Sequence, residues 1–276
     1  MALAKQGSGR MAMEDFRGAI VLVTGASTGL GRAIAVETAV RGAAAVVINY
    51  VSSQAEAETT AREVEALGAE AILVQGDVAK DEDCARIAAA AAKHGRIDAL
   101  FNNAGTTKFA QDHANLDAVD AADFLRLYSV NVIGAFQMIR AARSLLEAAP
   151  STSAVVNTAS IAGIMGNGSS VPYAASKGAL VTMTLSLARA LAPKIRVNAV
   201  CPGFIDTPWF GRGMSAGRVD RLREGVAAAM PLKVASQPED IAGAAVFLAS
   251  PAARHITGEA LIVDAGMHLG AVTLAR

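Results

Sequence analysis

Tyr173 and Lys177 are the residues whose types and spacing most directly suggest chemistry. Residues four apart share one face of a helix, so this phenol and this ammonium can work together as an acid/base pair. A free phenol ionises near pH ~10. Proton exchange at neutral pH needs a pKa lower by about three units, which a neighbouring cation could partly supply. An amphipathic helix with a surface lysine has the same spacing, so other residues must decide between the two interpretations.

A glycine-rich turn follows the apolar residues 21–23. It reads Thr-Gly-Ala-Ser-Thr-Gly-Leu-Gly over residues 24–31 and leads into a helix expected over residues 30–40. In a phosphate cradle, Gly25 would permit the tight turn, Gly29 would let backbone approach a pyrophosphate, and Gly31 would let the helix lie against the strand. The spacing differs from the common G-x-G-x-x-G pattern, and a purely structural strand-to-helix turn would also explain it.

Short apolar segments alternate with helical ones along the chain, which is typical of parallel βαβ units. Strands with little polar alternation are buried on both faces. We therefore predict one α/β domain, a doubly wound parallel sheet of about seven strands with helices on both faces. Gly42, Gly68 and Gly95 are expected to end helices in a left-handed conformation, and residues 236–239 to form a capping box. The predicted strands are residues 20–23, 46–48, 71–74, 99–101, 154–156, 195–200 and 261–263.

Two segments depart from this alternation. Residues 1–15 mix charged residues with glycine and serine, so we interpret them as a disordered lead-in or an expression remnant before a domain over residues 16–276. Residues 204–230 contain Trp209, Phe210 and Arg212 among several glycines. Long irregular segments are often binding loops, so a mobile substrate lid is expected here, with a plain surface insertion as the alternative.

The composition argues against several classes of function. Lys+Arg and Asp+Glu are equal at 25 each, which favours neither nucleic acid nor an anionic membrane as a partner. No apolar run approaches the ~18 residues of a transmembrane helix, and the start lacks the apolar stretch of a signal peptide. Cys84 and Cys201 are far apart, and the four histidines show no ligand pattern, so no metal site is predicted. A cytoplasmic protein with reduced thiols is expected.

Taken together, the motifs resemble those of the short-chain dehydrogenase/reductases, in particular members like 3-oxoacyl-(acyl carrier protein) reductase and glucose dehydrogenase. The resemblance covers about residues 16–269 and implies a Rossmann fold. The motifs that carry it occur in that family's order and spacing: the turn at 24–31, Asp77-Val78, Asn102-Asn103-Ala104-Gly105, Asn131, Ser160, Tyr173-x-x-x-Lys177 and Pro202-Gly203 with Thr207.

The resemblance implies hydride transfer between C4 of a nicotinamide and a carbonyl or secondary alcohol. Ser160 would hold the reacting oxygen, and Tyr173 would be the general acid/base. Lys177 would favour the tyrosinate and bind the ribose hydroxyls of the cofactor. Asn131 would hold a water that links Lys177 to solvent, at an irregularity in a helix expected over residues 125–146.

The resemblance also implies a cofactor site at the carboxyl ends of the strands. Asp77 would bind the adenine amino group, with a helix N-cap as its alternative role, and Val78 would pack on the adenine ring. Residues 103–105 would approach the adenine-side ribose, and residues 202–207 would hold the carboxamide and the phosphates. The expected cofactor-binding residues are Gly25, Ser27, Thr28, Gly29, Leu30, Gly31, Tyr50, Ser52, Asp77, Val78, Asn103, Ala104, Gly105, Tyr173, Lys177, Pro202, Gly203, Ile205 and Thr207.

NADP is the expected cofactor, with NAD or dual use left open. NAD-preferring relatives carry an acid at the end of the second strand, where this chain has Asn-Tyr-Val-Ser-Ser over residues 49–53. An acid there would repel a 2′-phosphate, so its absence permits NADP. Val51 stands where many NADP-binding relatives carry arginine, which leaves Arg32, Ser52 and Ser53 as candidates for phosphate binding.

The substrate is expected to be a small carbonyl or alcohol compound. Ser160, Met165, Tyr173 and Trp209 are the predicted substrate-binding residues, and with Phe109 and Phe210 they suggest a neutral or hydrophobic substrate, although Arg212 leaves an acidic one open. The family usually forms dimers or tetramers through its long apolar helices, so a homotetramer or homodimer is expected. A non-catalytic protein that senses nicotinamide nucleotides on the same fold is the alternative. Ala265 replaces a glycine usual in the family, which affects local packing or a subunit contact.

Overall fold

The computed structural model describes residues 15–110, 112–211 and 216–270. These residues form one sheet of seven parallel strands in the order β3-β2-β1-β4-β5-β6-β7. The order reverses between β1 and β4, and at such a point the loops after neighbouring strands diverge and leave a crevice. The predicted doubly wound sheet is therefore confirmed. The strands are β1 (Ile20–Val23), β2 (Ala45–Tyr50), β3 (Glu70–Gln75), β4 (Ala99–Asn102), β5 (Ser153–Thr158), β6 (Ile195–Pro202) and β7 (Ala260–Val263).

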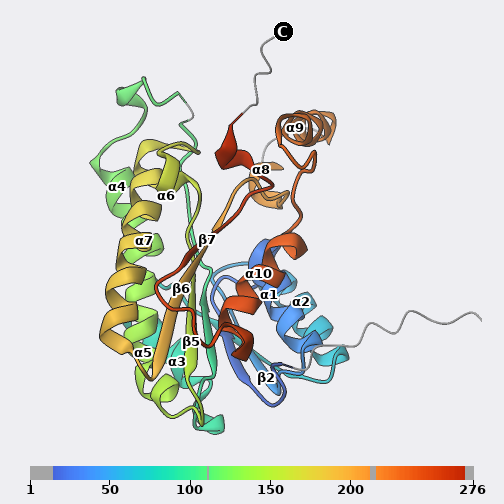
Figure 1. Cartoon of the computed structure of the whole chain (residues 1–276), viewed down its shortest axis with the longest axis vertical. Helices are drawn as coiled ribbons and strands as arrows, with labels where there is room; N and C mark the ends of the chain where they lie inside the picture. Colours follow the sequence, from blue (N-terminus) through green and yellow to red (C-terminus); the bar gives the residue numbers. More distant parts are fainter. Residues whose placement is uncertain (1–14, 111, 212–215, 271–276) are drawn as a thin grey trace, which may run out of the picture.

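Helices cover both faces of the sheet (Figure 1). One face carries α1 (Gly29–Val40), α2 (Gln54–Ala66) and α10 (Pro238–Ala249). The other carries α3 (Asp81–Ala89), α4 (Ala121–Tyr128), α5 (Ala135–Glu147), α6 (Ala162–Met165) and α7 (Val171–Leu191). Between β6 and α10 lie α8 (Pro208–Gly211) and α9 (Ala216–Ala229), and single 3-10 turns cover Ala92–His94, Leu116–Ala118, Pro251–Ala253 and Met267–Leu269.

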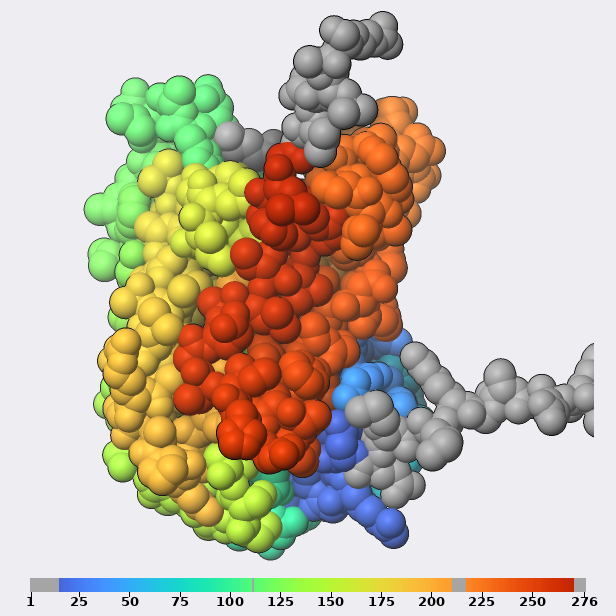
Figure 2. Space-filling model, viewed as in Figure 1, coloured from blue at the N-terminus to red at the C-terminus, as the bar shows by residue number. Residues whose placement is uncertain are grey.

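The two largest hydrophobic cores lie on opposite sides of the sheet. Val21 and Val23 of β1 pack with α1 and α10, whereas Ile20 and Leu22 pack with α3 and α5. Successive side chains of a strand point to opposite faces, so an unbroken apolar strand serves both cores. The prediction of burial on both faces holds for the inner strands and is wrong for β3 and β7, which are only partly buried because they are the sheet edges. Figure 2 shows the C-terminal segment of α10 and β7 exposed beside α7.

The turns that end the helices largely follow the sequence predictions. Gly42, Gly68 and Gly95 have φ of 93°, 90° and 70°, as expected for left-handed helix ends. Ala265, which the resemblance places where relatives carry glycine, also adopts a positive φ of 56°, a conformation that costs a residue with a Cβ roughly 1 kcal/mol.

Two local predictions were wrong. The capping box at α10 is formed by Gln237 and Asp240 rather than by residues 236–239, because Ser236 pairs its backbone with Ile205. The segment 204–230 is largely helical rather than irregular, since the alanine, arginine and glutamate residues of α9 favour a helix despite two glycines. Its role as a lid stays a prediction. Over the described ranges, no helix is long and apolar enough to cross a membrane.

Candidate active site

A cavity of about 790 Å³ opens at the carboxyl ends of the strands, where the strand order reverses. It extends from the turn after β1 to the start of α7, so it joins the predicted phosphate cradle to the predicted acid/base pair. The predicted site residues that line it are Gly25, Thr28, Gly29, Leu30, Asn103, Ala104, Gly105, Ser160, Tyr173, Lys177, Pro202, Gly203, Ile205, Thr207 and Trp209.

Other predicted site residues lie outside this lining. Tyr50 and Val78 are buried in the hydrophobic cores, and Val78, with 3% of its surface exposed, has little side-chain surface left for an adenine ring. Met165 is 44% exposed on α6 and does not line the cavity. Ser27 lies partly buried in the glycine-rich turn, and its carbonyl accepts a hydrogen bond from Thr60. Phe210 and Arg212 cannot be placed, since the side chain of Phe210 and the whole of Arg212 lie outside the described residues.

The glycine-rich turn holds the start of α1 close to the sheet. A Cβ on Gly31 would lie 2.3 Å from the carbonyl oxygen of Gly25, and one on Gly25 would lie 2.9 Å from Cα of Ala104. Gly25 and Gly29 also have positive φ, at 61° and 56°. The N-cap Thr28 makes no side-chain hydrogen bond to the first turn of α1. The amides at this helix start therefore have no side-chain cap, which leaves them available to an anion in the cavity.

Two asparagines brace this turn, and sequence reasoning missed the role of one of them. Asn49 accepts a hydrogen bond from the Gly25 amide (3.2 Å) and donates to the carbonyl of Gly76 (2.9 Å). Asn103 donates from Nδ2 to the carbonyls of Thr24 (3.2 Å) and Gly25 (3.1 Å). Asn49 stood out in the sequence only because residues 49–53 contain no acid. A buried asparagine at the end of a central strand was the available signal, because such a group needs partners.

Tyr173 lies in the first turn of α7. Ser170 caps this helix by accepting a hydrogen bond from the Tyr173 amide at 3.3 Å. Burial raises the pKa of Tyr173 to about 12, although a hydrogen bond with the Ser160 hydroxyl acts in the opposite direction. The sequence suggested that a cation would lower the pKa of this phenol. The structure shows the opposite direction, because desolvation disfavours the phenolate and dominates here.

Lys177 is buried, with 3% of its surface exposed. Its Nζ donates to the carbonyl of Thr158 at 2.6 Å and lies 5.8 Å from the centroid of the Tyr173 ring. Burial lowers the pKa of Lys177 to about 8. The ammonium therefore lies over the ring face rather than in hydrogen-bond contact with the phenol oxygen.

The helical irregularity predicted around Asn131 is present as a π-helical segment, Ser129–Gly134, between α4 and α5. The Asn131 side chain accepts from the Thr106 amide (2.8 Å) and donates to the Thr106 carbonyl (3.0 Å) and the Ser176 hydroxyl (3.0 Å). Ser176 in turn donates to the carbonyl of Tyr173 at 2.8 Å. Asn131 thus ties the loop after β4 to α7. Its role toward a water stays a prediction.

A glycine contact fixes Ser160 relative to α7, and sequence reasoning missed it. A Cβ on Gly163 would lie 2.5 Å from the backbone nitrogen of Gly178 and from the carbonyl carbon of Lys177. Backbone therefore meets backbone where α6 crosses α7. Ser160, just before α6, accepts a hydrogen bond from the Ala162 amide at 3.1 Å, which orients its hydroxyl.

The adenosine end departs from two expectations. Arg32, a candidate for binding a 2′-phosphate, forms a bidentate pair with Glu63 instead, with Nε–Oε2 and Nη2–Oε1 distances of 2.9 and 2.8 Å. The alternative role of Asp77 as a helix N-cap is wrong, since α3 begins at Asp81 and Lys80 is its N-cap. Asp77 instead accepts a hydrogen bond from the Ala79 amide at 3.0 Å. Val51 and Ser52 are exposed at the end of β2.

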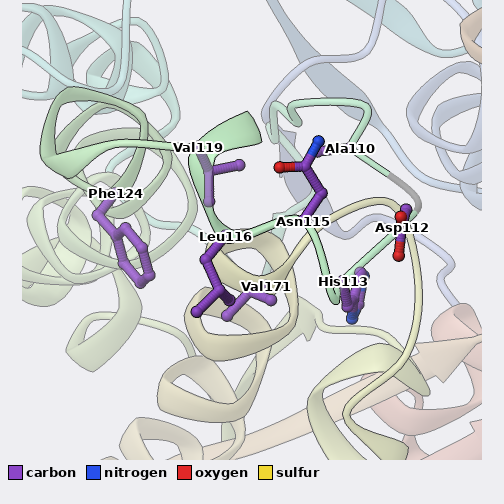
Figure 3. Close-up of a pocket in the computed structure, with 8 residues that line it drawn as sticks. All are labelled: Ala110, Asp112, His113, Asn115, Leu116, Val119, Phe124 and Val171. Carbon is purple, nitrogen blue, oxygen red and sulfur yellow. The ribbon is translucent and has the colours of Figure 1, made fainter.

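A second hollow, of about 190 Å³, lies between the loop after β4 and the starts of α4 and α7 (Figure 3). His113, Leu116, Phe124 and Val171 are among its lining residues, and none of the predicted site residues is. Within the described ranges, no group of three or more His, Cys, Asp or Glu side chains could hold a metal ion.

Replacing Gly31 by alanine tests the cradle. Because the added methyl group would meet the Gly25 carbonyl at 2.3 Å, we expect Gly31→Ala to lower the free energy of unfolding by about 1–3 kcal/mol and to weaken nicotinamide-nucleotide binding at least about tenfold. Gly243→Ala in α10 is the control, since its methyl group meets nothing within 4 Å. Chemical denaturation and fluorescence titration check both variants. Equal affinity in Gly31→Ala and the control would contradict the assignment.

Comparison with known proteins agrees with this site. The family model described as enoyl-(acyl carrier protein) reductase matches residues 25–268. L-rhamnose 1-dehydrogenase (NAD(P)(+)) of Sphingomonas sp. is 38% identical over 260 residues, which cover 93% of this chain and 99% of that protein.

Two solved structures match as well. The aldohexose dehydrogenase of Thermoplasma acidophilum has a TM-score of 0.83 at 27% identity, covering 96% of this chain and 99% of that one. A short-chain dehydrogenase/reductase (glucose/ribitol dehydrogenase) of Brucella melitensis has a TM-score of 0.79 at 33% identity, covering 92% and 98%. The chain therefore belongs to the short-chain dehydrogenase/reductase family and is an NAD(P)-dependent oxidoreductase.

Proposed function

We propose that this enzyme interconverts a carbonyl and a secondary alcohol with Tyr173 as the general acid/base. The observation that carries the proposal is that Ser160, Tyr173 and Lys177 share one cavity with the uncapped start of α1. A dinucleotide with its phosphates at α1 would extend toward Tyr173. The nicotinamide cofactor, when bound, supplies or accepts the hydride.

The residues present fit such a cofactor. The amides of Gly29 and Leu30, at the uncapped start of α1, would hold the pyrophosphate. Thr207 lies beside Gly29, with its Cγ2 3.3 Å from the position a Cβ there would take, so its side chain is close enough to reach the same phosphates. Pro202, Gly203 and Ile205 line the cavity farther along and would contact the carboxamide end.

Each catalytic role follows from burial and hydrogen bonding. With its pKa at about 12, Tyr173 is protonated at neutral pH, the form needed to donate a proton to a carbonyl oxygen during reduction. The Ser160 hydroxyl would hold that same oxygen. Lys177 is positively charged below its pKa of about 8 and would bind the ribose hydroxyls while stabilising the phenolate left after donation.

Removal of the phenol oxygen tests the proposal. We expect Tyr173→Phe to lower kcat by about 10² or more while cofactor affinity stays within about twofold, because only the proton donor is lost. Tyr128→Phe, at the end of α4 and outside the cavity lining, is the matched control. Steady-state kinetics and nucleotide titration give both quantities. Near-normal turnover of Tyr173→Phe would sink the mechanism.

Cofactor affinity should depend on pH through Lys177. Its folded-state pKa is lowered from 10.5 to about 8, so the ammonium is present below pH 8 and is lost above it. If the ammonium holds the ribose, affinity for NADH should fall about tenfold between pH 7 and pH 9, following the protonated fraction. Lys177→Ala should bind weakly and independently of pH, with lower turnover as well. An unchanged affinity in that variant would remove the ribose role.

We propose NADP as the preferred cofactor. The support is that residues 49–53 contain no acid and that Ser52 is exposed at the end of β2. Because Arg32 is engaged by Glu63, the serines are the remaining candidates for contact with the 2′-phosphate. NADPH should therefore bind more tightly than NADH. Ser52→Asp should weaken NADPH binding at least about tenfold, because a carboxylate repels the 2′-phosphate. Parallel fluorescence titrations check this, with Ser151→Asp on a distant loop as control. Tighter NADH binding by the unmodified enzyme would overturn the proposal.

We also propose self-association through α4, α5 and the π-helical segment between them. This face exposes Leu125 (73%), Ile133 and Phe136, an apolar surface that a second copy would cover. Light scattering should give the mass of a dimer or tetramer, and a monomer that persists at high concentration would contradict the assignment.

A further inference from the structure

The wall of the cavity near Tyr173 combines polar and apolar side chains and is almost uncharged. Among the described residues that line it, Lys177 is the only charged side chain, and it is committed to Thr158 and the cofactor. Hydroxyl and amide groups come from two loops, through Thr107 on one and Asn167 and Ser169 on the other. The apolar residues Phe109, Ile161, Phe204 and Trp209 line the same cavity, so the pocket expected from the sequence to be apolar is mixed.

Thr107 and Ser169, the hydroxyl pair, hydrogen-bond to each other at 2.5 Å although they are 62 positions apart. Backbone contacts fix both loops. The Ala110 amide donates to the Ser169 carbonyl at 2.7 Å, and Asn131 holds the backbone of Thr106. The hydroxyl pair is therefore positioned before any substrate enters.

The hydroxyl pair lies next to the acid/base residues. Gly168, adjacent to Ser169, lies against the Tyr173 ring, since a Cβ on it would make van der Waals contact with Cδ1 of the ring at 3.7 Å. Gly105, two residues before Thr107, similarly faces Lys177, whose Nζ would lie 3.6 Å from a Cβ there. A group bound by the hydroxyl pair would thus be a near neighbour of the oxygen that Tyr173 protonates.

The hydrogen-bonding capacity of the pair selects the kind of group it binds. Two bonded hydroxyls have two protons to share, one of which is used between them, while several lone pairs remain. The Thr107 hydroxyl also donates to the Lys108 carbonyl at 3.3 Å, so its proton is in use as well. The pair is therefore chiefly an acceptor, and it suits a neutral hydroxyl, which can donate to it. A carboxylate or phosphate has no such proton and finds no free cation among the described lining residues.

We propose that the substrate carries a second hydroxyl close to the reacting carbon, as in vicinal diols, hydroxyketones and sugars, and that Thr107 and Ser169 bind it. The proposal rests on the proposed function, since it concerns the same cavity. Asn167 adds a further donor and acceptor beside the pair, and Phe109 and Trp209 would contact the C–H faces of the substrate.

The test compares substrates that differ by one hydroxyl group. With saturating NADP⁺, trans-1,2-cyclohexanediol should be oxidised with kcat/KM at least about tenfold above that of cyclohexanol, and 2-hydroxycyclohexanone should be preferred to cyclohexanone in the reverse direction. Thr107→Val should reduce that ratio to within about twofold by lowering the rate on the diol alone. Thr107→Ser should restore the preference, because it keeps the hydroxyl. Thr59→Val, on an exposed part of α2, is the matched control.

Each outcome decides the proposal. A wild-type ratio near one, or a preference that persists in Thr107→Val, overturns it, while turnover that depends on Tyr173 leaves the proposed function standing. Higher kcat/KM on 3-hydroxybutyrate than on the diol also overturns it, because that substrate is an anion. A loss of activity on both alcohols in Thr107→Val, without recovery in Thr107→Ser, assigns the pair a purely structural role. Absence of turnover on every compound, in enzyme that binds NADPH, overturns the substrate inference, whereas failure to bind NADPH would refute the proposed function instead.

Discussion

The structure depends on how closely the backbone of α1 approaches the turn after β1. Gly31 rests on the carbonyl of Gly25, and Asn103 reaches from the end of β4 to hold the same carbonyl. This contact sets where the amides of α1 point, and it joins β1 and β4 at the position where the strand order reverses. The opposite end of the cavity is held by a similar backbone contact at glycine, since Gly163 meets Gly178 where α6 crosses α7. Two backbone contacts thus fix the two ends of one cavity.

Burial, rather than a charge pair, dominates the electrostatics of Tyr173 and Lys177. It moves the pKa of both groups toward their neutral forms, upward for the phenol and downward for the ammonium. The free enzyme consequently keeps its phenol protonated and its lysine close to the edge of its charged range at physiological pH. In the free enzyme, the Thr158 carbonyl stabilises the ammonium by accepting a hydrogen bond from it.

The sequence predicted the parts of the site that depend on short-range spacing. Tyr173 and Lys177 fall on one helix, and the glycines fall in one turn, so local geometry is enough to place them. Contacts between distant positions were not predictable in the same way. The pairing of Arg32 with Glu63 spans 31 positions, and the bracing of the turn by Asn49 depends on which strand lies next to β1. The direction of the Tyr173 pKa shift depends on desolvation, which residue spacing does not report. The helical form of residues 216–229 was not predicted, because Gly217 and Gly225 oppose the helix propensity of the residues between them.

The close contacts at glycine also limit how this enzyme can change over evolution. Gly25, Gly31, Gly163 and Gly168 each have a neighbour within 3.0 Å of the position a side chain would occupy, so almost any replacement disturbs the catalytic frame. The side chains of Thr107, Asn167 and Ser169 line the cavity from loops outside the helices and strands. New substrates are therefore most accessible through a few substitutions in these loops, with the hydride-transfer geometry left intact.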